Sequence, residues 1–176
     1  MTRVAWYGAS VLVALRVASV LSQAPDFSGT WKLDPSRSRV GTATLAGAIK
    51  AGAPDILYIT HAANGTVIVE SRINESQSRI YTPGGKTTTP VVPSGNISMT
   101  SKWEGRTLVA EGRQESASGT ATSVKEMLAL GADGLMLTID ITTTGSDDTS
   151  TSTLVYTRIT AVEPCEKWPT PCKVPR

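Results

Sequence analysis

The chain has 176 residues, of which 40% are hydrophobic and 18% are charged, so it is long enough for one globular domain with its own core. Two of its 17 basic residues and none of its 15 acidic residues lie in the first 24 positions, which leaves 15 basic against 15 acidic residues in the remainder. This balance gives no electrostatic basis for binding nucleic acid or an anionic membrane surface.

The first 24 residues have the pattern of a secretory signal peptide. Arg3 gives the positively charged start, residues 4–15 form the apolar run, and small residues follow at Ser22 and Ala24. Arg16 interrupts the apolar stretch, so we expect no stable membrane insertion. Cleavage after Ser22 and cleavage after Ala24 both stay open, because a proline follows Ala24. The pattern predicts export and does not distinguish the periplasm from the extracellular space.

The mature chain opens with Asp-Phe-Ser-Gly-Thr-Trp-Lys-Leu at residues 26–33. We predict a first strand over residues 26–34, in which Gly29 lets the backbone pass close under the indole of Trp31. Trp31 would then close one end of a barrel as a structural residue.

Residues 42–51 are rich in Gly and Ala and fit either a short helix or a loop.

From residue 55 to 159 apolar and polar residues alternate between turn signals such as Asn64-Gly65 and Glu104-Gly105. This pattern predicts a meander of antiparallel strands joined by short turns. The strands expected after the first one are residues 55–62, 66–72, 76–82, 86–92, 96–103, 106–115, 120–130, 135–144 and 149–159. Closure into a barrel is favoured because so long a meander would otherwise leave two exposed edges.

Three short motifs resemble the lipocalin and fatty-acid-binding-protein superfamily. Gly29-Thr30-Trp31 resembles its Gly-x-Trp signature, residues 102–107 resemble a Trp-Asp-Gly-Lys hairpin, and residues 151–156 resemble its closing Thr-Arg-x-Tyr strand. The resemblance implies an all-β, antiparallel up-and-down barrel of about eight to ten strands over residues 25–160, with one short helix after the first strand as a lid. It also implies an interior site for a small hydrophobic ligand.

The same resemblance supplies candidate site residues. In fatty-acid-binding proteins an arginine and a tyrosine at alternate positions of the last strand hold the ligand carboxylate. Here Tyr156 stands at the tyrosine position and Leu154 at the arginine position, so this clamp is not carried over, and Arg113 is a substitute whose face stays open. In lipocalins an arginine of the last strand packs on the Gly-x-Trp indole, so Arg158 is expected either to cover Trp31 or to face solvent. Further expected ligand-binding residues are Tyr58, Met99, Leu137 and Ile139.

The sequence contains no pattern that indicates an enzyme. His61 is the only histidine, so it cannot form a multi-histidine metal site, and its alternation with apolar neighbours is typical of a core or rim residue. Acidic residues occur singly on the expected strands, at Glu70, Glu111, Glu115, Glu126 and Asp140. We therefore expect no catalytic residue, no metal and no cofactor.

Residues 161–176 form a proline-rich tail that contains both cysteines, Cys165 and Cys172. In an exported chain two cysteines this close are expected to form a disulfide. The loop is small, so the bond should contribute about 2 kcal/mol or less to stability. A redox-active or metal-binding pair is the alternative, although the spacing is not Cys-x-x-Cys and no histidine is near.

Two functions stay open on these grounds. The first is an exported carrier that binds a small hydrophobic, lipid-like ligand inside the barrel. The second is a non-transporting structural or interaction module, with a filled barrel and a partner site at the rim or the C-terminal tail. Apolar inner faces suit both functions equally. We expect a monomer. The N-glycosylation sequons at Asn64, Asn74 and Asn96 would matter only in a eukaryotic secretory pathway.

Overall fold

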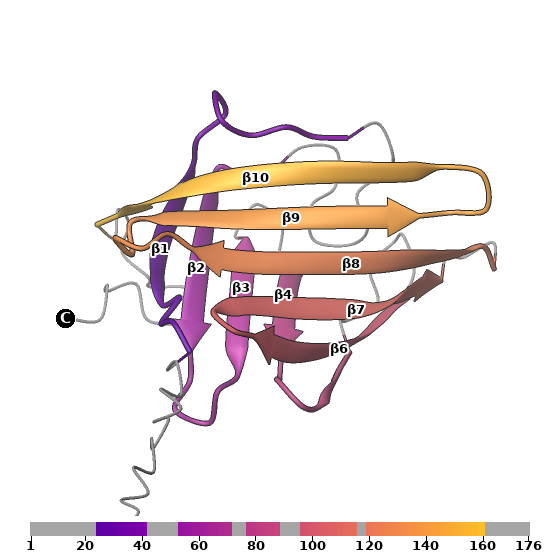
Figure 1. Cartoon of the computed structure of the whole chain (residues 1–176), viewed down its shortest axis with the longest axis horizontal. Coiled ribbons are helices and arrows are strands. Elements are labelled where there is room, and N and C mark those ends of the chain that lie inside the picture. The colour runs from indigo at the N-terminus through magenta and orange to yellow at the C-terminus, as the bar shows by residue number, and fades with distance from the viewer. Residues whose placement is uncertain (1–23, 42–52, 72–76, 89–95, 116–118, 161–176) are drawn as a thin grey trace, which may run out of the picture.

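The computed structural model describes residues 24–41, 53–71, 77–88, 96–115 and 119–160, which form ten β-strands (Figure 1). In chain order the strands are β1 (Gly29–Leu33), β2 (Ile56–His61), β3 (Val67–Ser71), β4 (Gln77–Tyr81), β5 (Lys86–Thr88), β6 (Asn96–Glu104), β7 (Thr107–Glu115), β8 (Ala121–Leu130), β9 (Met136–Thr144) and β10 (Thr149–Ile159). These segments contain no helix, and hence none long and apolar enough to span a bilayer.

All neighbouring strands pair antiparallel, in the spatial order β4-β3-β2-β1-β10-β9-β8-β7-β6-β5. The pairing of β1 with β10 joins the two ends of the meander. β4 and β5 stand at the two ends of this order, and no ladder joins them in the described part of the chain. The chain just beyond β4 reaches β6 instead, where Gly84 N donates to Ser101 O at 2.7 Å. The prediction of an antiparallel up-and-down barrel is therefore confirmed, with one unpaired join between β4 and β5 that we call the seam.

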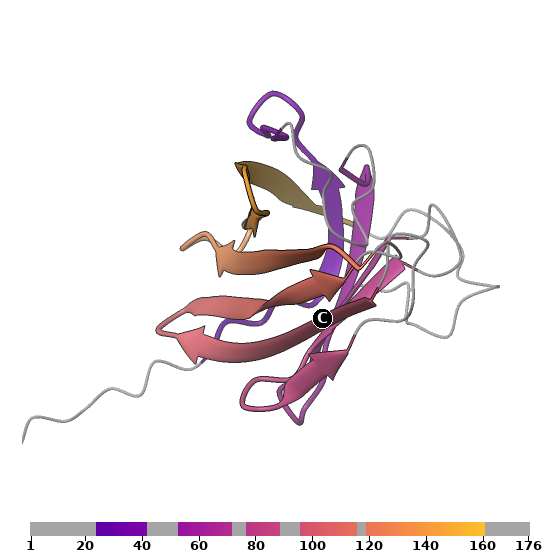
Figure 2. The same cartoon turned by 90° about the vertical axis from the view of Figure 1, so that its right-hand side faces the viewer.

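The strands lie in two layers that face each other. β6–β10 run across the direction of β1–β4, and the turned view shows the two groups on opposite sides of the interior (Figures 1 and 2). The sheet passes from one layer to the other at the short β1–β10 ladder, which spans Trp31↔Arg158 and its neighbours. Side chains from β4 and from β8 can therefore meet across the interior although the strands are not neighbours.

Alternation along each strand separates an inner from an outer face. On β9 the inner residues Leu137, Ile139 and Ile141 are buried, while their neighbours are only partly covered. The expected turns are present, and Gly65 (φ 84°) and Gly105 (φ 62°) adopt the left-handed backbone that favours glycine. The hydrophobic core consists of Phe27, Trp31, Leu57, Ile59, Val67, Val69, Tyr81, Ile97, Met99, Leu108, Ala110, Val124, Leu128, Leu137, Ile139, Ile141, Leu154 and Tyr156.

Trp31 closes one end of the barrel. Its side chain is completely buried, and its indole Nε1 donates to Phe27 O at 3.0 Å. The guanidinium of Arg158 lies over the ring, with Cζ 4.6 Å from the ring centroid, and Arg158 Nη2 donates to Asp26 O at 3.2 Å. Of the two interpretations of Arg158, the structure has the one in which it covers Trp31.

Gly29 lies beside the indole of Trp31. A Cβ built on Gly29 would have Trp31 Nε1 as its nearest neighbour, at 3.7 Å, which is ordinary van der Waals contact. Its φ of 143°, however, is a backbone conformation that residues with a Cβ rarely adopt. The backbone conformation at the start of β1, more than the space under the indole, therefore favours glycine.

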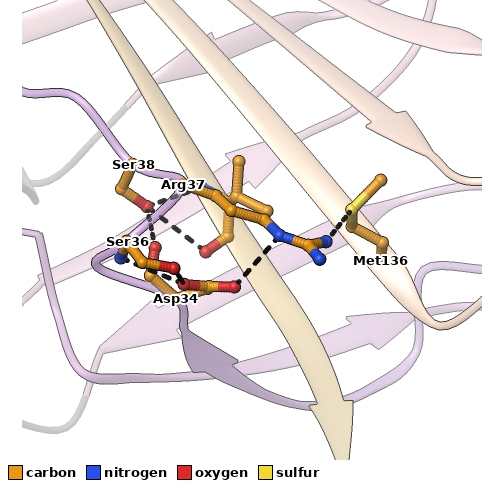
Figure 3. A network of polar contacts seen from close by, with 6 residues as sticks. Asp34, Ser36, Arg37, Ser38 and Met136 are labelled. Atoms are coloured by element: carbon orange, nitrogen blue, oxygen red, sulfur yellow. Dashed lines mark hydrogen bonds and ion pairs between the residues drawn. The ribbon is translucent and has the colours of Figure 1, made fainter.

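The segment after β1 folds back onto β10 (Figure 3). Asp34 organises the turn, since its carboxylate accepts from Ser36 N at 3.0 Å and pairs with Arg37 Nε at 3.4 Å. Ser38 Oγ donates to Asp34 O at 2.7 Å and accepts from Val155 N at 2.9 Å. After this turn the chain runs along the edge of β10, where Arg39 and Thr153 exchange two backbone hydrogen bonds.

Several expectations lie outside the described residues. They are the signal peptide predicted at residues 1–24, of which only Ala24 is described, the helix or loop at 42–51, and the tail at 161–176 with Cys165 and Cys172. The expected strand at 86–92 is described only over Lys86–Thr88.

Candidate functional site

Three polar side chains form a buried cluster inside the barrel. Arg79 on β4 places Nε 3.1 Å and Nη2 3.0 Å from the same oxygen, Oε1 of Glu126 on β8. Tyr81, two residues after Arg79, donates its hydroxyl to Glu126 Oε2 at 2.6 Å. Because β4 and β8 belong to different layers, these contacts cross the interior. We call Arg79, Tyr81 and Glu126 the ionic centre.

The ionic centre is shielded from water. The exposed fractions of Arg79, Tyr81 and Glu126 are 4%, 3% and 2%. Burial, and then the charge of Glu126, raises the pKa of the Tyr81 phenol well above its ordinary value. Tyr81 is therefore a neutral hydrogen-bond donor at physiological pH, and the carboxylate receives three hydrogen bonds or ion-pair contacts from two side chains.

The sequence places this cluster by simple alternation. Arg79 and Tyr81 are two residues apart on β4, so both face inward. Glu126 alternates with Val124 and Leu128 on the buried face of β8. Glu126 therefore places a carboxylate within a row of apolar side chains, and its partners Arg79 and Tyr81 come from the opposite layer.

Two buried hydroxyls nearby have no hydrogen-bond partner within the described segments, Ser101 Oγ and Tyr156 Oη. Ser101 pairs with Ala110, and Ala110 pairs with Glu126, so Ser101 shares a cross-strand row with the ionic centre. Tyr156 lies two rows nearer the Trp31 end, and burial, with a smaller effect of Asp55, raises the pKa of its phenol. A buried hydroxyl without a partner costs about 1–3 kcal/mol, so each of these groups is a place where a polar ligand atom or a water would be favourable.

The end of the barrel interior away from Trp31 is mixed in polarity. Beyond the row of Glu126, the inner faces carry the buried polar residues Gln114, Thr143 and Ser150 together with the buried apolar residues Ile97, Met99 and Val124. Ser152, in the row of Glu126, accepts from Gly41 N at 2.8 Å. The backbone just before residues 42–52 thus lies toward this mixed end, away from the end closed by Trp31.

The structure brings most of the expected ligand-binding residues to the interior. Met99, Leu137, Ile139, Leu154 and Tyr156 are all buried on inner faces. Their exposed fractions are at most 4%, so they form a packed wall rather than the lining of an open space.

Two of the expected residues do not face the interior. Arg113 on β7 is exposed, because the inner face of that strand is carried by Leu108, Ala110 and Gln114. Tyr58 on β2 alternates with the buried Leu57 and Ile59 and lies on the outer face. Neither side chain can therefore anchor a ligand inside the barrel.

Two hollows lie on the outer side of β6 and β7, with volumes of ≈ 440 Å³ and ≈ 400 Å³. Both include Thr100 and Glu111, and Arg113 belongs to the second. Glu111 is paired with Lys125 at 2.7 Å, and both of these side chains are about half exposed. The hollows are open surface features, and the buried Ser101 is among the residues that line the first of them.

His61 belongs to a ring cluster near the Trp31 end. Its imidazole stacks with Phe27 and Trp103, at centroid distances of 6.5 Å and 6.0 Å, and Phe27 stacks with Trp103 at 5.6 Å. His61 Nδ1 lies 3.8 Å from Asp26 Oδ1. These contacts place His61 at the rim of the packed core. Among the described residues no group of three His, Cys, Asp or Glu side chains is arranged to hold a metal ion.

The ionic centre as a unit was not predicted from the sequence. Residues 76–82 were expected only as a strand, and Glu126 only as a single carboxylate. The available signal was an arginine and a tyrosine at alternate positions, together with one acid in the apolar stripe of β8. The pairing itself depends on two strands that are distant in the sheet, and no local pattern encodes it.

In comparisons with known proteins, no family model and no curated protein sequence matches the chain.

Proposed function

We propose that the barrel binds a small, largely apolar molecule in its interior and that the ionic centre fixes the polar end of this ligand. The observation that carries the proposal is the contact of Arg79 and Tyr81 with Glu126, surrounded by apolar side chains. Binding sites for small molecules commonly combine apolar walls with a few polar groups that set the orientation of the ligand. Leu128, Ile139 and Leu154 would contact the apolar part.

Stability alone is a poor reason for the ionic centre. Removing two charges from water costs several kcal/mol per ion, and apolar residues of similar volume often do as well or better in such positions. Ser101 and Tyr156 add two buried hydroxyls without described partners to the same interior. A role in recognition accounts for polar groups that packing does not require.

The seam offers a route into the interior. Arg79 and Tyr81 lie on β4, which has a ladder with β3 on one side and, within the described residues, none with β5 on the other. An edge strand with one ladder can move outward at a lower cost than a strand held on both sides. Their contacts with Glu126 hold this edge against the opposite layer, so binding at the ionic centre and opening at the seam involve the same residues.

A filled barrel that serves as a structural or interaction module is the second candidate. It is favoured by the absence of exposed surface on inner side chains such as Leu128, Leu137 and Leu154. In that case Arg79 and Glu126 would tie two layers of a solid core together, and partners would bind outside it. A catalytic role is not part of either proposal.

Native mass spectrometry of protein purified from its own source distinguishes the two. A co-purifying small molecule that is released by organic solvent supports the ligand-binding barrel, whereas a bare protein mass in repeated preparations contradicts it. Ala110→Leu, which fills the inner face beside Glu126, should abolish co-purification. Ala129→Leu, on the outer face of the adjoining strand, should preserve it and controls for general effects.

Export is a separate part of the proposal, together with a disulfide between Cys165 and Cys172. Both depend on the sequence of residues 1–24 and of the tail. The intact mass of the protein from its source tests them, because it gives the N-terminal residue. Alkylation with and without reductant shows whether the two cysteines are joined.

A further inference from the structure

We infer that the interior site selects uncharged, hydroxyl-bearing amphipathic molecules and disfavours carboxylates such as free fatty acids. This inference rests on the proposed function and specifies its ligand class. It follows from the charge balance of the ionic centre, in which the single cation, Arg79, already has an internal carboxylate at 3.0 Å.

The charge of Arg79 is not available to an acidic ligand. Its Nε and Nη2 both contact Oε1 of Glu126, so the positive charge is neutralised by the protein itself. A ligand carboxylate placed beside Arg79 would also lie beside Glu126, and like charges repel strongly in an interior of low dielectric constant. The centre therefore penalises a second negative charge.

The remaining cation on the described inner faces lies at the closed end of the barrel. Arg158 covers the Trp31 ring and donates Nη2 to Asp26 O, while its Nε has no partner among the described residues. Leu128, Ile139 and Leu154 share a cross-strand row that is two inner positions of β10 away from Arg158, so a carboxylate bound in that row would be desolvated without a cation beside it.

A hydroxyl group suits the same position well. Glu126 Oε2 accepts one hydrogen bond from Tyr81, and a carboxylate oxygen has the capacity for a second. Ser101 Oγ, in the same cross-strand row, is buried and has no partner among the described residues, so it can donate to or accept from a neutral ligand group. Ala110 stands between Ser101 and Glu126 and takes up little space. A primary alcohol can thus use two polar groups of the protein without adding a charge.

The wild-type test compares 1-decanol with decanoate, at concentrations where neither aggregates and at about pH 8, where the acid is ionised. Displacement of a fluorescent apolar probe or isothermal titration calorimetry gives both affinities. We expect the alcohol to bind at least about tenfold more tightly. Equal or tighter binding of decanoate would overturn this inference and leave the proposed function intact. Absence of binding by both compounds would instead remove the proposed function and this inference together.

Glu126→Gln provides the sharper test because it leaves Arg79 charged and without its carboxylate. Decanoate affinity should rise at least about tenfold in this variant, so that the preference is reversed. Glu111→Gln is the matched control, since Glu111 is half exposed on the outer face and pairs with Lys125. An unchanged preference in a folded Glu126→Gln protein contradicts the inference.

Ser101→Ala keeps the test decisive if Glu126→Gln does not fold. It should weaken 1-decanol several-fold and leave decanoate unchanged, whereas Ser98→Ala, at an exposed position of the same strand, should change neither. Equal weakening of alcohol and acid by Ser101→Ala would count against a hydroxyl-specific site.

Discussion

Arg79 and Glu126 are 47 positions apart in the sequence and lie on strands from opposite layers, yet Arg79 Nη2 is 3.0 Å from Glu126 Oε1. Together with the hydrogen bond from Tyr81, this ion pair connects the edge strand β4 to the layer of β6–β10. It is buried in an interior whose core is mainly apolar. The pair therefore links the stability of the barrel to its proposed binding site, and each of these roles can be tested.

The first prediction concerns the energetic cost of breaking this pair. Glu126→Leu leaves the Arg79 guanidinium buried without its carboxylate and should lower the free energy of unfolding by about 3–5 kcal/mol. The double variant Arg79→Met/Glu126→Leu removes both charges and should be clearly more stable than the single variant. Urea unfolding followed by tryptophan fluorescence measures both. If the double variant is as unstable as Glu126→Leu, the cost does not come from an unpaired charge.

The second prediction concerns the closed end of the barrel. Arg158→Ala should lower the free energy of unfolding by about 1 kcal/mol, because it removes the cation–π contact with Trp31. Trp31→Ala should cost about 3–5 kcal/mol, since it deletes a completely buried indole. Arg106→Ala, in the exposed β6–β7 turn, is the control and should be nearly neutral. An effect of Arg158→Ala no larger than that of Arg106→Ala would mean that the contact with Trp31 contributes nothing.

The third prediction concerns a glycine on an inner face. A Cβ on Gly112 would lie only 2.8 Å from Met99 Cγ and would clash with the backbone carbonyl of Ser98. Gly112→Ala should therefore destabilise the barrel by about 1–3 kcal/mol through overpacking. Gly145→Ala, whose Cβ would have its nearest neighbour at 3.8 Å, should be tolerated. Thermal unfolding of both variants checks this, and equal melting temperatures would show that β6 and β7 separate easily at this point.

The fourth prediction concerns alkaline pH. Burial and the charge of Glu126 hold the pKa of Tyr81 well above the ordinary value of 10.0 in the folded protein. The unfolded chain therefore releases this proton first, so the stability from Tyr81 is complete below about pH 10 and is lost as the pH rises toward the native pKa.

Tyr81→Phe should accordingly lose less stability than the wild type between about pH 9 and pH 11. In Tyr81→Phe the loss of stability with rising pH should become smaller but should not vanish, because burial also raises the pKa of Tyr156. Tyr58→Phe, on the outer face, is the control and should keep the wild-type dependence. Urea unfolding at the two pH values measures the difference, and identical slopes in all three proteins would contradict the assignment.

The strands were predictable because their signals are local. Alternation on β8 and β9 and the glycines at 65 and 105 depend on neighbouring residues alone, and these hairpins are confirmed. The contact of Trp31 with Arg158 was accessible through resemblance, because both residues belong to short motifs at the ends of the barrel. Barrel closure required only the rule that a long meander avoids free edges.

The site was less predictable because its residues meet across the barrel. No pattern around Glu126 reveals that β4 will lie opposite β8 and present Arg79 there. Arg113 and Tyr58 show the related difficulty, since the direction of a strand residue depends on register, and a shift by one position reverses the face. Tyr58 was expected to contact a ligand in the interior, and the face of Arg113 was left open; both lie on the outer face.

The most direct test of an interior site anchored at the ionic centre is a methyl NMR titration of the purified protein with 1-decanol. We predict saturable shift changes for Leu128, Ile139 and Leu154, which are buried around the ionic centre, and none for the exposed Leu135 and Val40. In the Glu126→Gln variant, the shift changes of Leu128, Ile139 and Leu154 should differ from those of the wild type. Changes confined to Leu135 and Val40, or no changes in any methyl group, would contradict the account.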